Sequence, residues 1–136
     1  MISKKMKYAI KALVYIAQNS KENSSVKTND IATKALIPKK FLEQILLELK
    51  KNRIVNSRQG SMGGYYLMKK PNEITLAAIY RLCEGPIALV SCASLNYYEP
   101  CTDCVDEATC KIKFALIEIR QKTIASFESI TIATLM

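Results

Sequence analysis

The sequence predicts a mainly α-helical fold with a small β-hairpin wing, a winged helix-turn-helix followed by a long C-terminal helix. Three observations predict it. Two short amphipathic segments meet at a tight turn around residues 36–38, a glycine-rich hairpin pattern follows them, and apolar residues recur every three or four positions over residues 111–129. With 136 residues and 49% hydrophobic composition, the chain has the length of one domain and enough apolar side chains for a core.

Positive charge is concentrated in the first half of the chain. Residues 1–70 carry 15 Lys and Arg against 4 Asp and Glu, whereas residues 71–136 carry 5 against 8. The resulting net charges, +11 and −3, account for the +8 of the whole chain. A basic first half indicates a polyanionic partner, nucleic acid before membrane. The alternative is a solvated lysine-rich surface.

The longest unbroken apolar run covers residues 12–17, much shorter than a membrane span or a signal peptide. We therefore expect a cytoplasmic protein with no membrane partner. In that compartment a cysteine cluster is more often metal-binding or redox-active than a set of structural disulfides. The chain has no histidine, which excludes catalysis by imidazole and leaves cysteine and carboxylate as the strongest candidate metal ligands.

The first 52 residues predict three helices. Residues 3–19 have an amphipathic pattern, residues 29–35 form a short helix capped by Thr28, and residues 39–51 form a helix that Pro38 opens and Asn52 ends in a left-handed conformation. The third helix is expected to bury Leu42, Ile45, Leu46 and Leu49. Two short helices joined in this way predict a helix-turn-helix, in which the N-terminal residues of the second helix reach base edges of DNA.

A β-hairpin is predicted after the third helix, with strands near residues 54–56 and 65–67 and a turn over residues 57–64 that contains three glycines. Such a wing lets the backbone approach phosphate or a minor groove. A nucleotide-binding P-loop is disfavoured because no Gly-Lys-Ser/Thr follows. The predicted DNA-binding residues of the helix-turn-helix and wing are Thr28, Lys39, Lys40, Glu43, Gln44, Arg58, Gln59 and Ser61.

Two more helices complete the prediction. Thr75 caps one that runs to about Glu84, where Gly85-Pro86 stops it, and Cys83 on its apolar face is expected to be a small buried side chain. The helix over residues 111–129 is too long for so small a domain to cover. Its apolar stripe is expected to meet its copy in a homodimer or to pack on the first helix. The chain thus divides into a winged helix-turn-helix DNA-binding domain (1–85), a cysteine-bearing sensor loop (86–110), and a dimerisation helix and tail (111–136).

Four of the five cysteines lie in the predicted loop, with the spacing C-x8-C-x2-C-x5-C: Cys92, Cys101, Cys104 and Cys110. Thiolates are good ligands for iron, zinc and cuprous ions, so an iron–sulfur cluster and a zinc site are both candidates. Metal-free thiol oxidation is a third interpretation. A small thiol oxidoreductase would need a thioredoxin-like βαβ context around Cys101 and Cys104, and the acidic neighbours there raise thiol pKa values.

Several segments together resemble the winged-helix regulators of the IscR and NsrR type, the iron–sulfur assembly regulator and nitric-oxide-sensitive repressor family. They are FLEQI at 41–45, LKKNRIV at 49–55, GSMGGY at 60–65, IYRLCEGP at 79–86, the cysteine loop, and SITIATL at 129–135. The resemblance covers nearly the whole chain. It implies a homodimeric transcriptional repressor on a palindromic double-stranded DNA operator, controlled by a redox- or nitric-oxide-sensitive iron–sulfur cluster on three loop cysteines.

On the family pattern, Cys104 and Cys110 match the last two cluster ligands and Cys92 the first, while Cys101 is additional. The fourth ligand differs from both named types. Lys113 stands where the assembly regulator has a histidine, and Tyr8 where the nitric-oxide sensor has an aspartate. The fourth ligand is then Cys101, or a carboxylate from Asp103, Asp106 or Glu107. The predicted cofactor is a two-iron or four-iron cluster, with zinc or none as alternatives, and a regulatory protein is an additional candidate partner.

Overall fold

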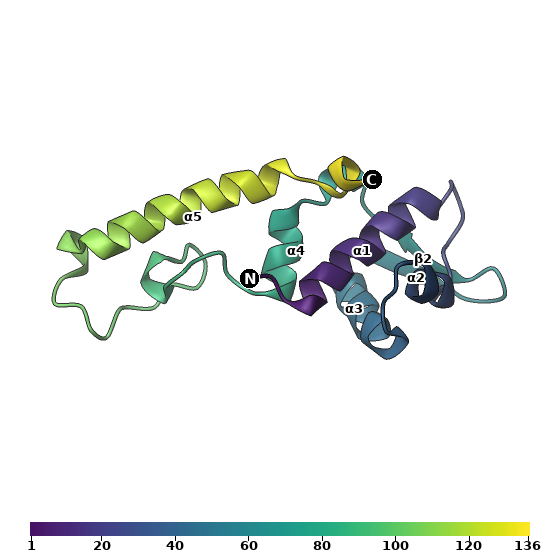
Figure 1. Cartoon of the computed structure of the whole chain (residues 1–136), viewed down its shortest axis with the longest axis horizontal. Helices are drawn as coiled ribbons and strands as arrows, with labels where there is room; N and C mark the ends of the chain where they lie inside the picture. The colour runs from purple at the N-terminus through teal and green to yellow at the C-terminus, as the bar shows by residue number, and fades with distance from the viewer.

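The computed structural model describes residues 1–136 as an elongated molecule with two distinct ends (Figure 1). A winged-helix core occupies one end. The other end consists of a long helix with the cysteine-bearing segment beneath it. The helices are α1 (Lys4–Asn19), α2 (Thr28–Lys34), α3 (Lys39–Lys51), α4 (Leu76–Cys83) and α5 (Lys111–Ser129), and the strands are β1 (Val55–Arg58) and β2 (Gly64–Leu67). Four short 3-10 helices complete the chain: η1 (Pro71–Glu73), η2 (Ser91–Ala93), η3 (Glu107–Thr109) and η4 (Ile132–Leu135). No helix is both long enough and apolar enough to cross a bilayer.

Helix α1 forms the centre of the core. It begins after Ser3, whose hydroxyl accepts a hydrogen bond from the Met6 amide at 3.1 Å and so satisfies one free N–H of the first turn. Its buried face consists of Met6, Ala9, Ala12, Leu13 and Ile16. The small side chains of Ala9 and Ala12 let neighbouring elements approach this face of the helix closely.

The helix-turn-helix has the predicted order, with one correction at its start. Helix α2 begins at Thr28 itself, Lys27 occupies the N-cap position, and no side chain caps the helix, so the predicted capping role of Thr28 is wrong. Helix α3 spans the predicted residues, and its four predicted apolar residues are all buried: Leu42, Ile45, Leu46 and Leu49. Pro38 precedes α3 with its φ at −56°, where its missing N–H removes no helical hydrogen bond.

Both α2 and α3 end in a left-handed residue that is not glycine. Asn52 has a φ of −90°, so the prediction that it adopts the left-handed conformation is wrong. Arg53 adopts it instead, with a φ of 56°, and the Ile54 amide bonds to the Leu49 carbonyl at 3.0 Å. At the end of α2, Leu36 has a φ of 54° and the Ile37 amide bonds to Ala32 at 2.9 Å. This is the Schellman hydrogen-bond pattern, in which glycine is the usual left-handed residue.

The wing is a two-stranded antiparallel hairpin that pairs Val55 with Leu67 and Arg58 with Gly64. Its turn is shorter than predicted because strand β1 continues through Arg58. A bridge between Val26 and Tyr65, with two backbone hydrogen bonds of 2.8 Å, anchors the hairpin to the segment before α2. A Cβ on Gly64, whose φ is +150°, would lie 2.3 Å from the Val26 carbonyl oxygen. This approach therefore requires glycine.

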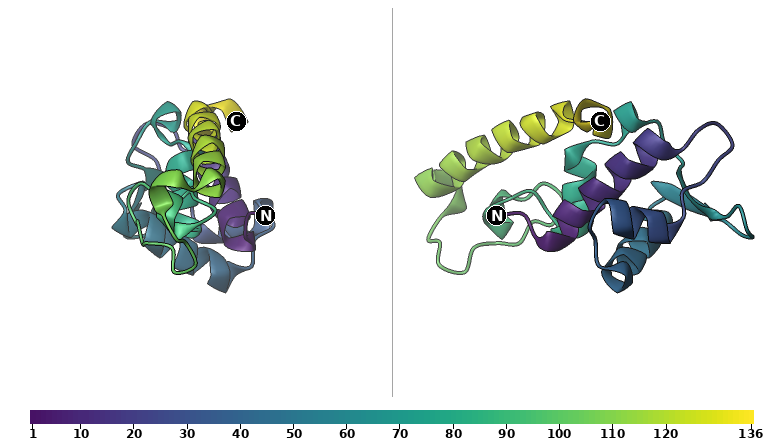
Figure 2. Two further views of the ribbon diagram at one scale, coloured as in Figure 1. Left: turned by 90° about the vertical axis from the view of Figure 1, so that its left-hand side faces the viewer. Right: turned by 45° about the vertical axis from the view of Figure 1, so that its right-hand side comes forward.

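The end of the chain returns to the winged-helix core (Figure 2). Thr75 caps α4 as predicted, accepting a hydrogen bond from the Ala78 amide at 3.2 Å. It also forms a β-bridge with Thr131, and the Ile132 amide bonds to the Ile74 carbonyl at 2.9 Å. Ile132 is fully buried in the core. The segment between α4 and η4 is therefore fastened to the same core at both ends.

Helix α5 spans the predicted residues, but none of its side chains is fully buried. Its inner side packs on α4 and η2, and the Phe127 ring lies 5.3 Å from the Tyr80 ring. The alternative expectation of packing mainly on the first helix is therefore wrong. Ile112 and Ile119, one heptad apart, remain 72% and 46% exposed. An apolar stripe is thus left uncovered within a single chain.

The left-handed Leu36 predicts a stabilising substitution. Leu36 is 79% exposed, so burial of its side chain adds little to stability. Its left-handed backbone has a steric cost that this burial does not offset. We expect Leu36→Asn to raise the free energy of unfolding by about 1 kcal/mol, because asparagine tolerates this conformation. Urea denaturation followed by circular dichroism measures the effect. Leu36→Ala, which keeps a Cβ and its clash, is the matched control, and equal stability of the two variants would contradict the argument.

Candidate functional site

The outward face of α3 carries the predicted recognition residues. Burial of the Leu42 and Leu49 side of the helix turns Lys39, Lys40, Glu43 and Gln44 outward, and all four are exposed. They lie in the first two turns of α3, the part of a recognition helix that reaches bases. Burial, and secondly the Glu43 carboxylate, raise the pKa of Tyr65, which indicates that Glu43 faces the wing side of α3.

The wing and the start of α2 enclose an open hollow of about 550 Å³. Four of the predicted DNA-binding residues line it: Thr28, Arg58, Gln59 and Ser61. The hollow contains only one hydrophobic lining residue and also includes Lys27 and three glycines of the wing. A polar, basic, glycine-rich surface is suited to the phosphate backbone of DNA. The structure thus brings the helix-turn-helix and wing residues to one end of the molecule.

Arg58 is already held by neighbouring groups. Its guanidinium lies 4.6 Å from the centre of the Tyr66 ring and donates a hydrogen bond to the Asn23 carbonyl. The cation–π contact and the hydrogen bond fix the arginine against the loop between α1 and α2. Lys50 reaches the same strand from α3, with its Nζ 2.7 Å from the Ser57 hydroxyl. Arg58 therefore lines the hollow from a fixed position, and Lys50 contacts Ser57, another residue of its wall.

A second hollow, of about 210 Å³, lies between the cysteine segment and the start of α5. All four loop cysteines line it: Cys92, Cys101, Cys104 and Cys110. Asp103, Glu107 and Lys113 also contribute to its wall, as do Val90, Ile112 and Leu116. Cys110 additionally caps α5, since its sulfur accepts a hydrogen bond from the Lys113 amide at 3.4 Å. We refer to this hollow as the cysteine pocket.

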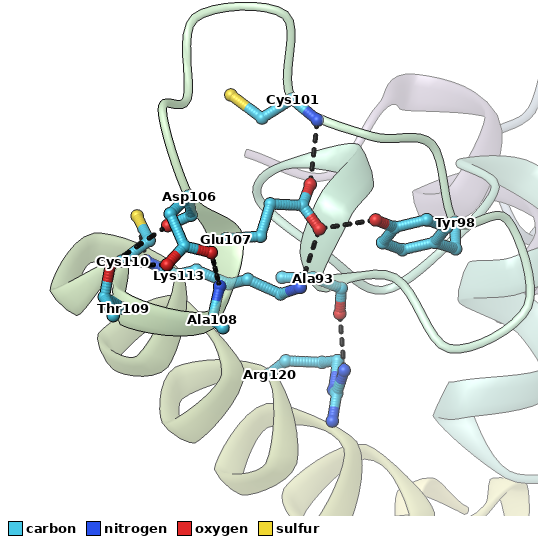
Figure 3. A network of polar contacts seen from close by, with 10 residues as sticks. All are labelled: Ala93, Tyr98, Cys101, Asp106, Glu107, Ala108, Thr109, Cys110, Lys113 and Arg120. Atoms are coloured by element: carbon cyan, nitrogen blue, oxygen red, sulfur yellow. Dashed lines mark hydrogen bonds and ion pairs between the residues drawn. The ribbon is translucent and has the colours of Figure 1, made fainter.

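A network centred on Glu107 shapes the cysteine pocket (Figure 3). One carboxylate oxygen accepts a hydrogen bond from the Cys101 amide at 2.9 Å. The other accepts from the Tyr98 hydroxyl at 2.5 Å and from the Lys113 ammonium at 3.1 Å. These three donors, led by Tyr98, lower the pKa of Glu107 to about 2. Glu107 therefore ties Cys101 to α5 as an ionised carboxylate.

A second contact anchors the cysteine segment further along α5. Arg120 donates a hydrogen bond at 2.5 Å to the carbonyl of Ala93 (Figure 3). Ala93 follows Cys92 directly in the sequence. Asp106 caps η3 by accepting from the Ala108 amide at 3.0 Å. Glu107, Tyr98 and Arg120 were not predicted to order the loop. Their contacts depend on how the loop folds, and no periodicity or spacing in the sequence signals them.

The thiols share the cysteine pocket without forming a metal site as they stand. No group of three or more Cys, Asp and Glu side chains has the arrangement of a metal site. Burial and the neighbouring Cys110 raise the pKa of Cys104, so this thiol is protonated at neutral pH. A metal would have to displace protons and draw the sulfurs together.

Cys83, Tyr8 and Lys113 are three residues whose relation to the cysteine pocket the structure defines. The first two lie outside the pocket, and the third borders it in another role. Cys83 packs against the core cluster as expected, but it is half-buried and not fully buried. Tyr8 makes an edge-to-face contact with Phe41 at 5.6 Å in the winged-helix core. Lys113 borders the pocket but is committed to its ion pair with Glu107. Within one chain, Tyr8 and Lys113 therefore do not serve as ligands in the cysteine pocket.

The winged helix-turn-helix with its basic recognition surface defines a DNA-binding transcriptional regulator. The family model for Rrf2, described as an iron-dependent transcriptional regulator, matches residues 2–136. The chain belongs to the Rrf2 family. The predicted fold and the predicted resemblance to regulators of the IscR and NsrR type are confirmed.

Individual relatives support this assignment over most of their length. The chain is 39% identical to an rrf2-like HTH-type transcriptional regulator of Rhodobacter capsulatus, covering 100% of this chain and 92% of the relative. It is 31% identical to the HTH-type transcriptional regulator NsrR of Geobacillus kaustophilus, covering 95% and 84%. Among solved structures, CymR, the global cysteine regulator of B. subtilis, superimposes with a TM-score of 0.77 at 28% identity, covering 99% of this chain and 95% of CymR.

The different surroundings of the cysteines predict different reactivities. Burial raises the pKa of the Cys83 thiol from 9.0 to about 11, and the more exposed Cys101 carries no such burial. Because the thiolate is the nucleophile, we expect iodoacetamide at pH 8 to alkylate Cys101 at least about ten times faster than Cys83. Time-resolved peptide mass spectrometry measures both rates. Alkylation of Cys83 as fast as Cys101 would contradict its assignment to the core.

Proposed function

We propose that this Rrf2-family regulator is a repressor whose binding to a palindromic operator is controlled by an iron–sulfur cluster in the cysteine pocket. The observation that carries the proposal is that Cys92, Cys101, Cys104 and Cys110 line one hollow between the cysteine segment and α5. The cluster would report redox state, iron–sulfur supply or nitric oxide. Two relatives named for such regulators, NsrR and IscR, align with the chain.

The donor set of the pocket fits an iron–sulfur cluster. Four thiols supply the ligands that both two-iron and four-iron clusters use. Cys92, Cys104 and Cys110 are the primary ligand candidates, and Cys101 is the fourth. Glu107 is the weaker candidate because both of its oxygens already accept hydrogen bonds. When bound, the cluster supplies an electron-transfer centre that reacts with oxidants or nitric oxide.

The protein's own part is to change the conformation of the cysteine segment. Cys101 is held to α5 through Glu107, and Cys92 lies beside the Ala93 carbonyl that Arg120 binds. Ligation would draw the thiols inward and tighten the segment on α5. Loss of the cluster would leave the Glu107 and Arg120 contacts and the packing of η2 on α5 to hold the segment. Since a palindrome is read at a fixed half-site spacing, a small shift between two recognition helices changes affinity or site choice.

A homodimer is part of this proposal. Helix α5 has no fully buried side chain, and Ile112 and Ile119 are exposed one heptad apart. A second α5 lying against this stripe would cover it. The dimer would present two copies of α3 to the two half-sites of the operator.

A metal-free thiol regulator of the same fold is the second candidate. It is favoured by the absence of a ready-made metal geometry among the cysteines and by the similarity to CymR, which is named as a cysteine regulator. The raised pKa of Cys104 is less favourable to it, because a protonated thiol oxidises slowly. In this case a protein partner or oxidation of the exposed Cys101 would supply the signal.

The proposal predicts a chromophore that depends on the pocket cysteines. We expect protein purified without oxygen to be brown and to contain iron and acid-labile sulfide, and Cys104→Ala to lose the colour. Absorption spectra with iron and sulfide analysis measure this, and Cys83→Ala, outside the pocket, is the matched control. Colourless protein with stoichiometric zinc would make the pocket a structural site. Colourless protein without metal would favour the thiol candidate.

The recognition surface predicts two distinct effects on DNA binding. We expect Gln44→Ala to weaken binding to the specific operator by about 1–3 kcal/mol, with little effect on random DNA, because it removes a base contact. Lys39→Ala should weaken binding to both and reduce the salt dependence of affinity, because it removes a phosphate contact. Fluorescence anisotropy at several salt concentrations measures both effects. Identical behaviour of the two variants would contradict the division of roles.

The exposed stripe of α5 predicts that one charge prevents dimerisation. We expect Ile119→Glu to convert the dimer to a monomer, because a carboxylate cannot be buried there without a partner. Size-exclusion chromatography with light scattering measures the mass. Gln121→Glu is the matched control, since it adds the same charge two residues further, about 200° around the helix. A dimeric Ile119→Glu, or a wild-type monomer, would contradict the proposed interface.

A further inference from the structure

The outward face of α3 contains one apolar residue. Lys40, Gln44, Leu47 and Lys51 follow one another at spacings of four, three and four residues, so they lie on one side of the helix, opposite its buried side chains. Leu47 is 54% exposed. Leu47 takes no part in the hydrophobic core. The residues that α3 contributes to the core are Leu42, Ile45, Leu46 and Leu49. Leu47 therefore offers an apolar contact in the middle of a polar recognition face, one that the polar side chains around it cannot make.

We infer that Leu47 is a specificity-determining residue that contacts the C5-methyl group of a thymine in the operator. This inference rests on the proposed function, in which the outward face of α3 enters the major groove. Of the groups that base pairs present in that groove, the thymine methyl is the apolar one, and apolar side chains read it. Lys40 and Lys51 lie on either side of Leu47 along this face. Both are cations suited to contacts with DNA phosphates, so Leu47 lies between two phosphate-binding groups.

The helix geometry places the expected base relative to the one read by Gln44. Leu47 follows Gln44 by three residues, an advance of about 4.5 Å along the helix axis. Adjacent bases of a strand are about 3.4 Å apart along the duplex. The thymine should therefore lie one to two base pairs from the base that Gln44 contacts, on the side toward which α3 leaves the groove.

Replacing single thymines by deoxyuridine tests the inference, because it removes the methyl group and nothing else. An operator selected from random duplex DNA by the full-length protein is the probe, and fluorescence anisotropy gives the affinities. We expect one deoxyuridine position per half-site to weaken wild-type binding about four-fold, the value of one apolar carbon removed from contact. Leu47→Ala should bind the thymine operator about as weakly and lose the deoxyuridine effect at that position only.

The matched control is Leu135→Ala, an exposed leucine in η4 that lies outside α3, the wing and the cysteine segment, and it should keep the wild-type profile. If Leu47→Ala retains the wild-type deoxyuridine profile while Gln44→Ala loses specificity, the inference fails and the proposed function stands. If the wild-type protein selects no sequence at all, both fail. A uniform loss across all thymines in Leu47→Ala would indicate a structural role and would also overturn the inference.

Discussion

Burial of one face of α1 is the constraint on which the rest of the structure depends. Helices α2, α3 and α4, strand β2 and the C-terminal η4 all contact this one helix. Because each of them buries its apolar side against α1, the opposite side of α3 is forced outward with its polar residues. The same packing leaves α5 and the cysteine segment outside the core, where they are open to a second chain and to a cofactor. The recognition surface and the cysteine pocket thus follow from one hydrophobic arrangement.

Both ends of the cysteine segment and α5 unit are attached to the core around α1. Glu84, two residues before the cysteine segment, accepts hydrogen bonds from the Ser3 amide at 2.8 Å and the Ser3 hydroxyl at 2.5 Å, at the start of α1. Beyond α5 the chain ends with Ile132 buried against the same core. A change in the segment can therefore act on α1 from both ends, and α1 packs directly on α3. The proposed coupling between the two sites would act through these contacts.

Local signals in the sequence predicted the elements that carry both sites. Pro38 and the spacing of apolar residues were sufficient to predict the bounds and the buried side of α3. Turn-forming residues were sufficient to predict the position of the wing. The left-handed Leu36 and Arg53 could not be predicted, because glycine or asparagine is expected there and the surrounding fold imposes the conformation. The return of Ile132 to the core depends on pairing with distant residues. The cysteine spacing indicated a shared site, whereas the Glu107 network depends on the folded loop.

The central claim is that the state of the cysteine pocket controls DNA binding. The most direct test compares the affinity of one protein batch for selected operators, with the cluster intact and after its anaerobic removal by a chelator. Coupling between two sites typically changes affinity between about five- and 150-fold, so we expect a difference of about ten-fold or more on at least one operator. Equal affinities of the two forms for every selected operator would contradict the account.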